Sequence, residues 1–370
     1  MPQLYLGLMS GTSMDGVDAA LVDLSGLHPR LLDCQTYPYP PELLSDLHLL
    51  CSQSDNEIEL MGQADRAVAK VFATASLKLL EDNYIRPDQV QAIGSHGQTI
   101  RHQPTGNNHF SLQIGDPNTI ATITGIDVIA DFRRKDIALG GQGAPLVPAF
   151  HNAVFASSEK SRVVVNIGGI SNLTYLPKNP ANSIIGFDTG PGNTLLDAWC
   201  KLHTGQEFDD KGKWAAQSCS DPELFRNLCS HPYFSAPAPK STGRELFNLS
   251  WLQKHIAALH KKLEAKTVQA TLVMFTAATI VSHIRQFKDV EEVYICGGGA
   301  LNEFLLEVLE SELHECELFT TEELGVAANS VEAMAFAWLA YAHKNKIHGS
   351  IPSVTGASRS AILGTYCSAD

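Results

Sequence analysis

The N-terminal segment, residues 4–24, contains two apolar, strand-like runs separated by a turn rich in Gly, Ser, Thr and Asp. This pattern predicts a β-hairpin. Because Gly permits positive φ angles, such a turn can direct several backbone N–H groups toward one anion. Gly-rich turns are common, so an ordinary solvent-exposed hairpin is the alternative interpretation of this segment.

Helix-like and strand-like patterns alternate along the rest of the chain. Apolar residues at helical spacing predict helices at 40–50, 58–80, 193–202, 271–287, 302–313 and 326–343. Further strands are predicted at 90–95, 110–114, 127–130, 162–167, 173–176, 184–187 and 293–296. Pro, Gly, Ser and Asp are frequent in residues 205–246, which predicts mostly loops with short helices. The alternation predicts an α/β protein with mixed sheets.

The length of the chain indicates two domains. Its 370 residues exceed the roughly 250–300 residues at which a single core stops growing. A polar, Gly-rich connector at 136–143 places the boundary near residue 145. We therefore expect lobes at 1–145 and 146–370, with the C-terminal helix able to pack back onto the first lobe.

The composition excludes several functional classes. A net charge of −13 argues against binding to nucleic acid and to anionic membranes. The eight Cys residues include no C-x-x-C pair, which favours reduced thiols over a zinc site or a disulfide framework. The N-terminus lacks a signal-peptide pattern, and no apolar run reaches the roughly 18 residues of a membrane span. A cytoplasmic protein is expected.

Two more glycine turns follow predicted strands. The second, Gly168-Gly169, separates residues 163–167 from a returning strand and so resembles the opening hairpin. The third, Gly297–Gly299, lies between the strand at 293–296 and a helix. A flat ring or a sugar can lie against backbone that carries no side chains, and a helix N-terminus favours an anion. Three such turns predict a nucleotide site better than any one of them.

Specific motifs are spread over nearly the whole chain. They are Gly7–Asp18, Ser95–Thr99, Ile114–Asp116, Asp131–Arg133, Gly140–Leu146, Asn166–Asn172, Phe187–Asn193 and the turn at Gly297. Together they resemble the anhydro-N-acetylmuramic acid kinase family of bacterial cell-wall recycling, within the sugar kinase, Hsp70 and actin superfamily. The resemblance implies a two-lobed, actin-like ATPase fold with ribonuclease H-like lobes and an interlobe cleft for ATP. It also implies Mg²⁺ and a homodimer.

The resemblance assigns the three turns to ATP. The residues are Gly11, Thr12, Ser13, Met14, Asp15, Gly16, Val17 and Asp18 in the first turn, Asn166, Gly168 and Gly169 in the second, and Gly297, Gly298 and Gly299 in the third. Sugar kinases of the superfamily usually carry an Asp two residues before the glycine of the first phosphate loop, where this chain has Met9. The candidate metal ligands are therefore Asp15, Asp18 and Asp188, which can act through waters.

Asp188 follows the apolar run at 184–187 and precedes a predicted helix. By position alone it fits a general base and a helix cap equally well. The resemblance favours catalysis and implies that Asp188 activates a water, which attacks C1 of 1,6-anhydro-N-acetylmuramic acid. O6 then leaves C1 and accepts the γ-phosphoryl group of ATP, which gives N-acetylmuramic acid 6-phosphate and ADP.

Two further residues are candidates for substrate binding. Arg133 follows a predicted strand, and its guanidinium can bind the lactyl carboxylate of the implied substrate in a bidentate manner. His96, at the end of another strand, is a candidate for a sugar hydroxyl or the acetamide group. A solvated charge and a structural histidine are the alternatives.

Two other functions remain alternatives at this point. One is a kinase of the same fold that phosphorylates a free hydroxyl or an acyl group. The other is an ATP-switched binding or scaffold protein, like actin or Hsp70, although no added peptide-binding domain is evident in the sequence.

Overall fold

The computed structural model describes residues 2–11, 14, 16–26, 28–51, 55–104, 106–243 and 246–370. The chain divides into two compact units, called here unit 1 (Met1–Val154 and Ser330–Asp370) and unit 2 (Phe155–Asn329). Unit 1 thus extends beyond the expected boundary near residue 145 and includes the C-terminal segment. Ring contacts explain part of this difference, since Phe150 packs against Trp338 with centroids 6.3 Å apart.

Unit 1 is built on a seven-stranded mixed sheet with the order β12-β6-β4-β1-β2-β3, and β5 pairs with β4. The strands are β1 (Leu4–Ser10), β2 (Val17–Asp23), β3 (Arg30–Tyr37), β4 (Val90–Gln103), β5 (Phe110–Ile114), β6 (Val128–Ala130) and β12 (Thr365–Cys367). β1, β2 and β3 form an antiparallel meander, whereas β4 is parallel to β1 and β6 is parallel to β4.

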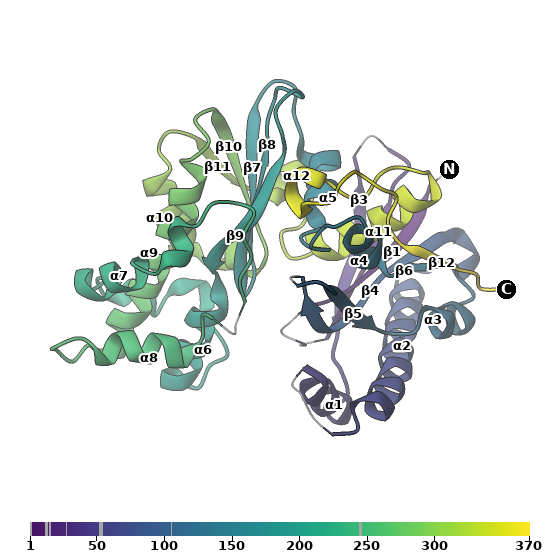
Figure 1. Cartoon of the computed structure of the whole chain (residues 1–370), viewed down its shortest axis with the longest axis horizontal. Helices are drawn as coiled ribbons and strands as arrows, with labels where there is room; N and C mark the ends of the chain where they lie inside the picture. Colours follow the sequence, from purple (N-terminus) through teal and green to yellow (C-terminus); the bar gives the residue numbers. More distant parts are fainter. Residues whose placement is uncertain are drawn as a thin grey trace. The chain divides into compact units, whose positions relative to one another are not determined.

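Helices cover both faces of this sheet (Figure 1). They are α1 (Pro41–Cys51), α2 (Glu57–Asp82), α3 (Pro117–Thr124), α4 (Phe132–Ala138), α5 (Val147–Phe155), α11 (Val331–Lys344) and α12 (Pro352–Thr355). Leu4, Leu6 and Leu8 of β1 belong to one apolar core with α1, α2 and α3. Tyr5 points to the other face, where its ring meets Tyr341 of α11 at 5.7 Å. Alternation along β1 therefore supplies both layers of core.

Two glycines let α11 lie directly on the central strands. A Cβ atom at Gly7 of β1 would come within 1.9 Å of Ala333 O, and one at Gly94 of β4 within 2.0 Å of Phe336 O. Any larger residue at these positions would push the helix backbone away from the sheet. The close approach fixes the C-terminal segment as part of unit 1.

Unit 2 repeats the topology with a five-stranded sheet in the order β11-β10-β7-β8-β9. The strands are β7 (Ser161–Ile167), β8 (Ile170–Leu176), β9 (Ile185–Pro191), β10 (Val290–Cys296) and β11 (Glu317–Thr320). β7, β8 and β9 are antiparallel, while β10 is parallel to β7 and β11 to β10. Each unit thus places a three-stranded meander before two parallel strands, and the predicted α/β class with two mixed sheets is confirmed.

The helices of unit 2 include one long apolar helix, α9, against which others pack. They are α6 (Asn193–Thr204), α7 (Pro222–Cys229), α8 (Leu249–Ala257), α9 (Ala265–Ile284) and α10 (Glu303–Glu312), with 3-10 turns η2 (Asp210–Gly212), η3 (Ala215–Gln217), η4 (Pro232–Ser235), η5 (Gly298–Leu301) and η6 (Thr321–Leu324). Within the described residues, α9 alone is long and apolar enough to cross a membrane, but 78% of its apolar window is buried inside the protein. Such burial is typical of the core helix of a globular unit.

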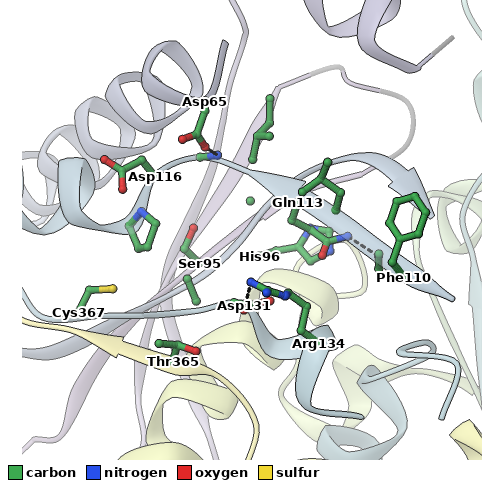
Figure 2. A pocket seen from close by; sticks show the side chains of 17 residues that line it. Asp65, Ser95, His96, Phe110, Gln113, Asp116, Asp131, Arg134, Thr365 and Cys367 are labelled. Atoms are coloured by element: carbon green, nitrogen blue, oxygen red, sulfur yellow. Dashed lines mark hydrogen bonds and ion pairs between the residues drawn. The ribbon is translucent and has the colours of Figure 1, made fainter. Parts of the chain in front are cut away.

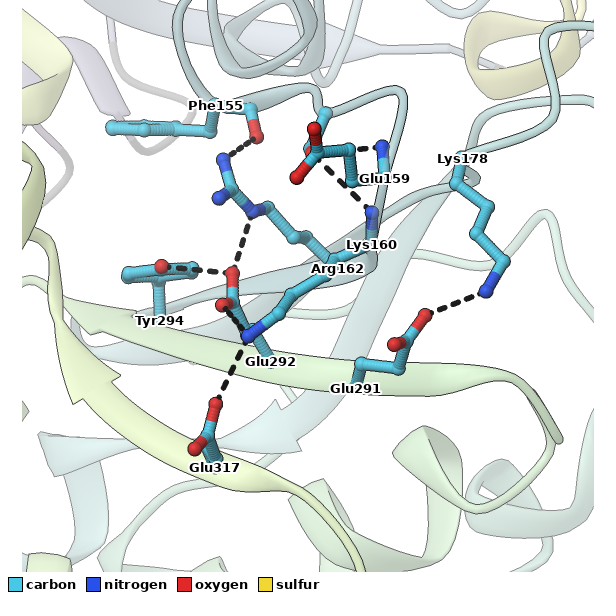
Figure 3. Close-up of polar contacts among 10 residues, drawn as sticks. Phe155, Glu159, Lys160, Arg162, Lys178, Glu291, Glu292, Tyr294 and Glu317 are labelled. Carbon is cyan, nitrogen blue, oxygen red and sulfur yellow. Dashed lines mark hydrogen bonds and ion pairs between the residues drawn. The ribbon is translucent and has the colours of Figure 1, made fainter.

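A buried ion-pair network joins three strands of unit 2 (Figure 3). Glu292 of β10 accepts hydrogen bonds from Lys160 Nζ at 2.5 Å, Arg162 Nε at 2.7 Å and the Tyr294 hydroxyl at 2.9 Å. Lys160 also binds Glu317 of β11 at 3.1 Å. Burial acts to raise the pKa of Glu292, but these hydrogen bonds and the two cations outweigh it and hold the pKa below its usual value.

Candidate active site

The first glycine turn joins β1 to β2 in unit 1. Thr12, Ser13 and Asp15, which the sequence assigns to ATP, lie outside the described residues. Met14 has a left-handed backbone with a φ of 58°, and its N–H donates to Gly11 O at 3.3 Å. A left-handed residue in a turn is one way to point neighbouring N–H groups to the same side, as an anion requires.

The second half of this turn is fixed by β3. A Cβ atom at Gly16 would lie 2.3 Å from Tyr37 O, so only glycine fits this close approach. Val17 is buried at the start of β2. The next residue, Asp18, accepts a hydrogen bond from Thr36 Oγ1 at 2.5 Å. The described residues of the turn are therefore held between the first three strands.

The two residues predicted to bind substrate, His96 and Arg133, are hydrogen-bonded to each other. His96 Nε2 lies 2.8 Å from Arg133 Nη2 and 3.2 Å from Nε, and its Nδ1 lies 3.2 Å from Ser10 O. A guanidinium can only donate, so Nε2 accepts and the Nδ1 proton is donated to the Ser10 carbonyl. Arg133 Nη1 also donates to Gly143 O at 2.7 Å. The imidazole thus holds the guanidinium on one side and the end of β1 on the other.

Burial decides the charge states of this pair. Burial, and then the charge of Arg133, hold the pKa of His96 well below its usual value, so the imidazole is neutral at physiological pH. Burial lowers the pKa of Arg133 to about 10, against the opposing charges of Glu332 and Asp136, so the guanidinium stays protonated. The pair therefore carries one positive charge, located on Arg133.

A pocket of about 590 Å³ opens beside this pair, lined by the middle of β4, by β5 and by the carboxyl end of β6. Figure 2 shows Asp65 and Asp116 at one end of it and the ion pair of Asp131 with Arg134, 3.2 Å apart, at the other. Ser95 Oγ is buried in its wall and has no hydrogen-bond partner among the described residues. Burial raises the pKa of Asp131, which also has a left-handed backbone. A buried hydroxyl among carboxylates suits a hydroxylated ligand.

In unit 2, the second glycine turn connects β7 to β8 and carries the start of α6. Gly168 O accepts the N–H of Asn193 at 2.8 Å, and Gly169 O accepts those of Gly192 and Thr194 at 2.9 and 3.1 Å. The first amides of α6 are therefore already engaged. An anion at this turn would be bound by the N–H groups of the turn itself.

The third glycine turn lies against the second. Gly297 has a φ of 79°, and a Cβ atom there would lie 2.3 Å from Asn166 Oδ1. A Cβ atom at Gly299 would lie 2.3 Å from Ile167 Cγ2. Unit 2 thus brings together the predicted nucleotide residues Asn166, Gly168, Gly169 and Gly297–Gly299.

A pocket of about 580 Å³ lies next to the third turn. Gly298 lines it together with Phe208 and Leu301, which are 60% and 63% exposed. Lys211 and Glu303, also in the lining, form an ion pair of 2.7 Å. Glycine backbone and two apolar side chains with a charged rim can hold a flat ring.

The predicted catalytic residue, Asp188, lies in β9 and is half-buried. Its Oδ2 accepts the N–H of Thr242 at 2.9 Å, and its carbonyl accepts the Tyr233 hydroxyl at 2.7 Å. Its own N–H donates to Lys240 O at 3.1 Å. The segment at 233–242 therefore fixes the carboxylate, as a general base requires.

Lys240 and Tyr233 were not singled out from the sequence. Lys240 Nζ lies 2.8 Å from His283 Nε2 and 4.7 Å from the centroid of the Tyr233 ring. Burial lowers the pKa of Lys240, and burial together with the charge of Asp188 raises that of Tyr233. Both lie outside the helices of the stretch at 205–246, in or after the short turn η4, where the sequence gives no periodicity to indicate which side chains meet.

The candidate metal ligands are spread over both units. Asp18 belongs to unit 1 and Asp188 to unit 2, and Asp15 lies outside the described residues. Among the residues that the structure describes, no group of three His, Cys, Asp or Glu could hold a metal ion. Isolated carboxylates fit Mg²⁺ carried on nucleotide phosphates, since Mg²⁺ commonly binds one or two carboxylates and keeps several waters.

Solved structures resemble the chain only distantly. The activator of the 2-hydroxyisocaproyl-CoA dehydratase from Clostridium difficile has a TM-score of 0.49 at 13% identity, over 94% of this chain and 96% of its own. This similarity is too low to support a conclusion about function.

Sequence comparison is far more specific. The family model described as anhydro-N-acetylmuramic acid kinase matches residues 3–369. The anhydro-N-acetylmuramic acid kinase of Shewanella halifaxensis is 53% identical over 366 residues, which cover 99% of each chain. That of Shewanella oneidensis is 52% identical over 365 residues, covering 99% of this chain and 98% of its own. The chain belongs to the anhydro-N-acetylmuramic acid kinase family.

Proposed function

We propose that this chain is an ATP-dependent kinase that opens the 1,6-anhydro ring of 1,6-anhydro-N-acetylmuramic acid and phosphorylates O6. The products are N-acetylmuramic acid 6-phosphate and ADP. The observation that carries the proposal is the family match over residues 3–369. We further propose that the reaction takes place in the cytoplasm, as part of cell-wall recycling.

Asp188 acts as the general base in this reaction. Its carboxylate takes a proton from a water as the water oxygen attacks C1. The C1–O6 bond breaks and its electron pair goes to O6, which bonds to the γ-phosphorus as the bond to the ADP oxygen breaks. Phosphoryl transfer to O6 stabilises the leaving oxygen, so one carboxylate suffices where glycosidases need two.

Arg133 binds the lactyl carboxylate of the sugar. Three of the five guanidinium N–H groups donate to His96 and Gly143. Among the described residues, the remaining N–H groups, one each on Nη1 and Nη2, have no partner, and they can grip a carboxylate in a bidentate manner. His96 supports this role through Arg133, since both of its ring nitrogens are engaged.

ATP binds through the three glycine turns. We assign its base to the pocket beside Gly298 in unit 2 and its phosphates to the turns at Gly11–Asp18 and Gly168-Gly169. Asp18 and Asp188, with Asp15, are the carboxylates that would hold Mg²⁺. When bound, Mg²⁺ neutralises charge on the phosphate oxygens.

The test is turnover of the anhydro sugar with Mg-ATP by the purified protein. In ¹⁸O-labelled water, the new phosphosugar should carry the label at C1 when it is sampled before anomeric exchange. Phosphorylation without the label would instead indicate a kinase for a free hydroxyl. Slow ATP hydrolysis that ignores sugars, with ATP-dependent assembly, would indicate a scaffold protein.

The same preparation tests the oligomeric state. We propose a homodimer, on the family resemblance alone. Light scattering should give twice the chain mass of 40.1 kDa, and a mass equal to one chain would contradict the dimer.

A further inference from the structure

Gln98 of β4 lies beneath the first glycine turn and is 0% exposed. Its Nε2 donates to Gly11 O at 3.3 Å and to Thr99 O at 3.1 Å. Its Oε1 lies 2.6 Å from Ser10 Oγ and 3.4 Å from the Tyr39 hydroxyl. The partners fix the orientation of the amide, because the reverse orientation would place its oxygen against two carbonyls.

These contacts reach both sides of the turn. Gln98 binds Gly11, the first residue after β1, directly. Ser10 Oγ lies 2.7 Å from Gly16 O and 2.6 Å from Gln98 Oε1, so its single proton is shared between the amide oxygen and the carbonyl of the last residue before β2. Gln98 and the Ser10 hydroxyl together therefore contact both ends of the turn.

His96, two residues before Gln98 in β4, extends this network to the proposed sugar site. His96 donates to the Ser10 carbonyl and accepts from Arg133. A shift of the guanidinium is thereby transmitted through one rigid ring to the residue that precedes the turn. His96 also packs on Phe336 of α11, with ring centroids 4.7 Å apart, which limits its freedom to move independently.

We propose that Gln98 is a positioning residue that holds the two ends of the first glycine turn, Gly11 and Gly16, in place for phosphate binding, and that His96 couples this turn to Arg133. The inference rests on the proposed function, because it takes the turn to bind ATP and Arg133 to bind the sugar. It predicts that the sugar, bound at Arg133, increases the affinity for ATP. Neither role was evident from the sequence.

Gln98→Glu is the sharpest test, because it keeps the length and the acceptor oxygens of the side chain. Only a protonated carboxyl group can donate to Gly11 O. Burial raises the pKa of such a carboxyl, so we expect it to lose its proton between about pH 5.5 and about pH 8.5. Over this range, the ratio of the variant's Kd for ATP to the wild-type Kd should rise about tenfold. The Kd for adenosine, which lacks phosphates, should not change.

The neighbouring titratable groups do not mimic this effect. The pKa of His96 is held well below neutrality by burial, and burial raises that of Tyr39 far above it. Dividing the Kd for ATP of Gln98→Glu by the wild-type Kd at each pH removes the effect on affinity of all other titrating groups. Tyr39→Phe is the matched control, since it deletes the longest of these contacts, 3.4 Å, and should leave the Kd for ATP within about twofold.

His96→Asn tests the coupling. The Asn amide retains a donor near the position of Nδ1 and removes the acceptor for Arg133. In the wild type, saturating sugar should lower the Kd for ATP several-fold. In His96→Asn the Kd for ATP alone should stay near the wild-type value, while the effect of the sugar disappears.

The outcomes separate the two proposals. Wild-type protein that binds no ATP would overturn both. Wild-type protein that binds ATP and turns over the sugar, with a pH-independent Kd ratio for Gln98→Glu, would overturn the positioning role alone. Retained coupling in His96→Asn would overturn the link to Arg133. If Gln98→Glu does not fold, Ser10→Ala tests the same contacts at the ends of the turn. An equal loss of affinity for ATP and adenosine would then count against the positioning role.

Discussion

The two units share one strand order but support ligands in different ways. In unit 1, the central strand β4 presents three side chains beside the end of β1 with which it pairs: Ser95, His96 and Gln98. In unit 2, the corresponding strand β10 ends at Cys296 and is followed by three glycines. One copy of the topology thus offers hydrogen-bonding side chains, and the other offers bare backbone.

The buried charges of the two units also differ in whether they have hydrogen-bonding groups available for a ligand. Unit 1 keeps the guanidinium of Arg133 beside a neutral imidazole, with two N–H groups left for a ligand. Unit 2 surrounds the carboxylate of Glu292 with Lys160, Arg162 and Tyr294. A charged group with unused hydrogen-bond donors is suited to binding a ligand, whereas a charged group surrounded by protein partners is suited to holding strands together. Substitutions at these positions should separate binding from stability.

The largest effect is expected for Asp188→Asn, which removes the proposed base of unit 2. Turnover of the anhydro sugar should fall about a thousandfold, while the Kd for ATP changes little. Steady-state kinetics with direct nucleotide titration measures both. Near-normal turnover would remove Asp188 from the base role.

Next in size is Glu292→Gln, which should lower the free energy of unfolding by about 3 kcal/mol, because Lys160 and Arg162 lose their buried partner. Since folding lowers the pKa of Glu292, its stabilisation is present above the unfolded carboxyl pKa of about 4.3 and is lost as pH falls through the folded value. Denaturant unfolding of wild type and variant should therefore converge in acid.

The matched control is Glu291→Gln, one residue away. Glu291 pairs with Lys178 at 2.7 Å, but both side chains are more than 40% exposed. This change should cost no more than about 0.5 kcal/mol. Equal losses for Glu291 and Glu292 would refute the importance of burial in this network.

Gly297→Ala should destabilise unit 2 by about 2 kcal/mol, because a Cβ atom strains a φ of 79° and collides with Asn166 Oδ1. The affinity for ATP should fall with it. Gly298→Ala is the stability control, since the nearest atom to its Cβ would be Asn193 Nδ2 at 3.4 Å. Thermal unfolding of the two variants compares them directly, and similar melting temperatures would argue against the close packing of the two glycine turns.

The smallest expected effect belongs to Arg133→Lys in unit 1. An ammonium keeps the charge but cannot bind His96, Gly143 and a carboxylate in a fixed plane, so the KM for the sugar should rise about tenfold. The Kd for ATP in the absence of sugar should stay near the wild-type value. An unchanged KM would place the lactyl carboxylate elsewhere.

Much of this architecture was predictable from hydrophobic periodicity. The expected helix at 58–80 is α2, which spans Glu57–Asp82, and the expected helix at 302–313 is α10, Glu303–Glu312. β3 was missed because apolar and polar residues do not alternate along it and none of its residues is buried, so no apolar period marks it. The helix expected from 326 begins only at Val331, after the left-handed Gly325 and the irregular residues that follow it.

The candidate site was predictable where glycines mark it and not where it depends on tertiary contacts. The sequence indicated His96 and Arg133 separately. Their mutual hydrogen bonds form because β4, which carries His96, pairs with β6, and α4, which carries Arg133, follows β6 directly. Gln98 lies in a motif that was recognised, yet its role depends on facing Ser10 across two parallel strands. Lys240 lies in an irregular segment, and only the folded chain places it beside Tyr233.

The glycine contacts between β1, β4 and α11 have a consequence for synthesis. Unit 1 begins at the N-terminus, but α11, which covers one face of its sheet, is translated after all of unit 2. A nascent chain therefore carries Gly7 and Gly94 as an uncovered groove for most of its time on the ribosome, although domains generally fold from the N-terminus onward. Unit 1 can be completed only after α11 has been synthesised. The order of synthesis, rather than local chain propensity, thus sets the earliest moment at which unit 1 can become stable.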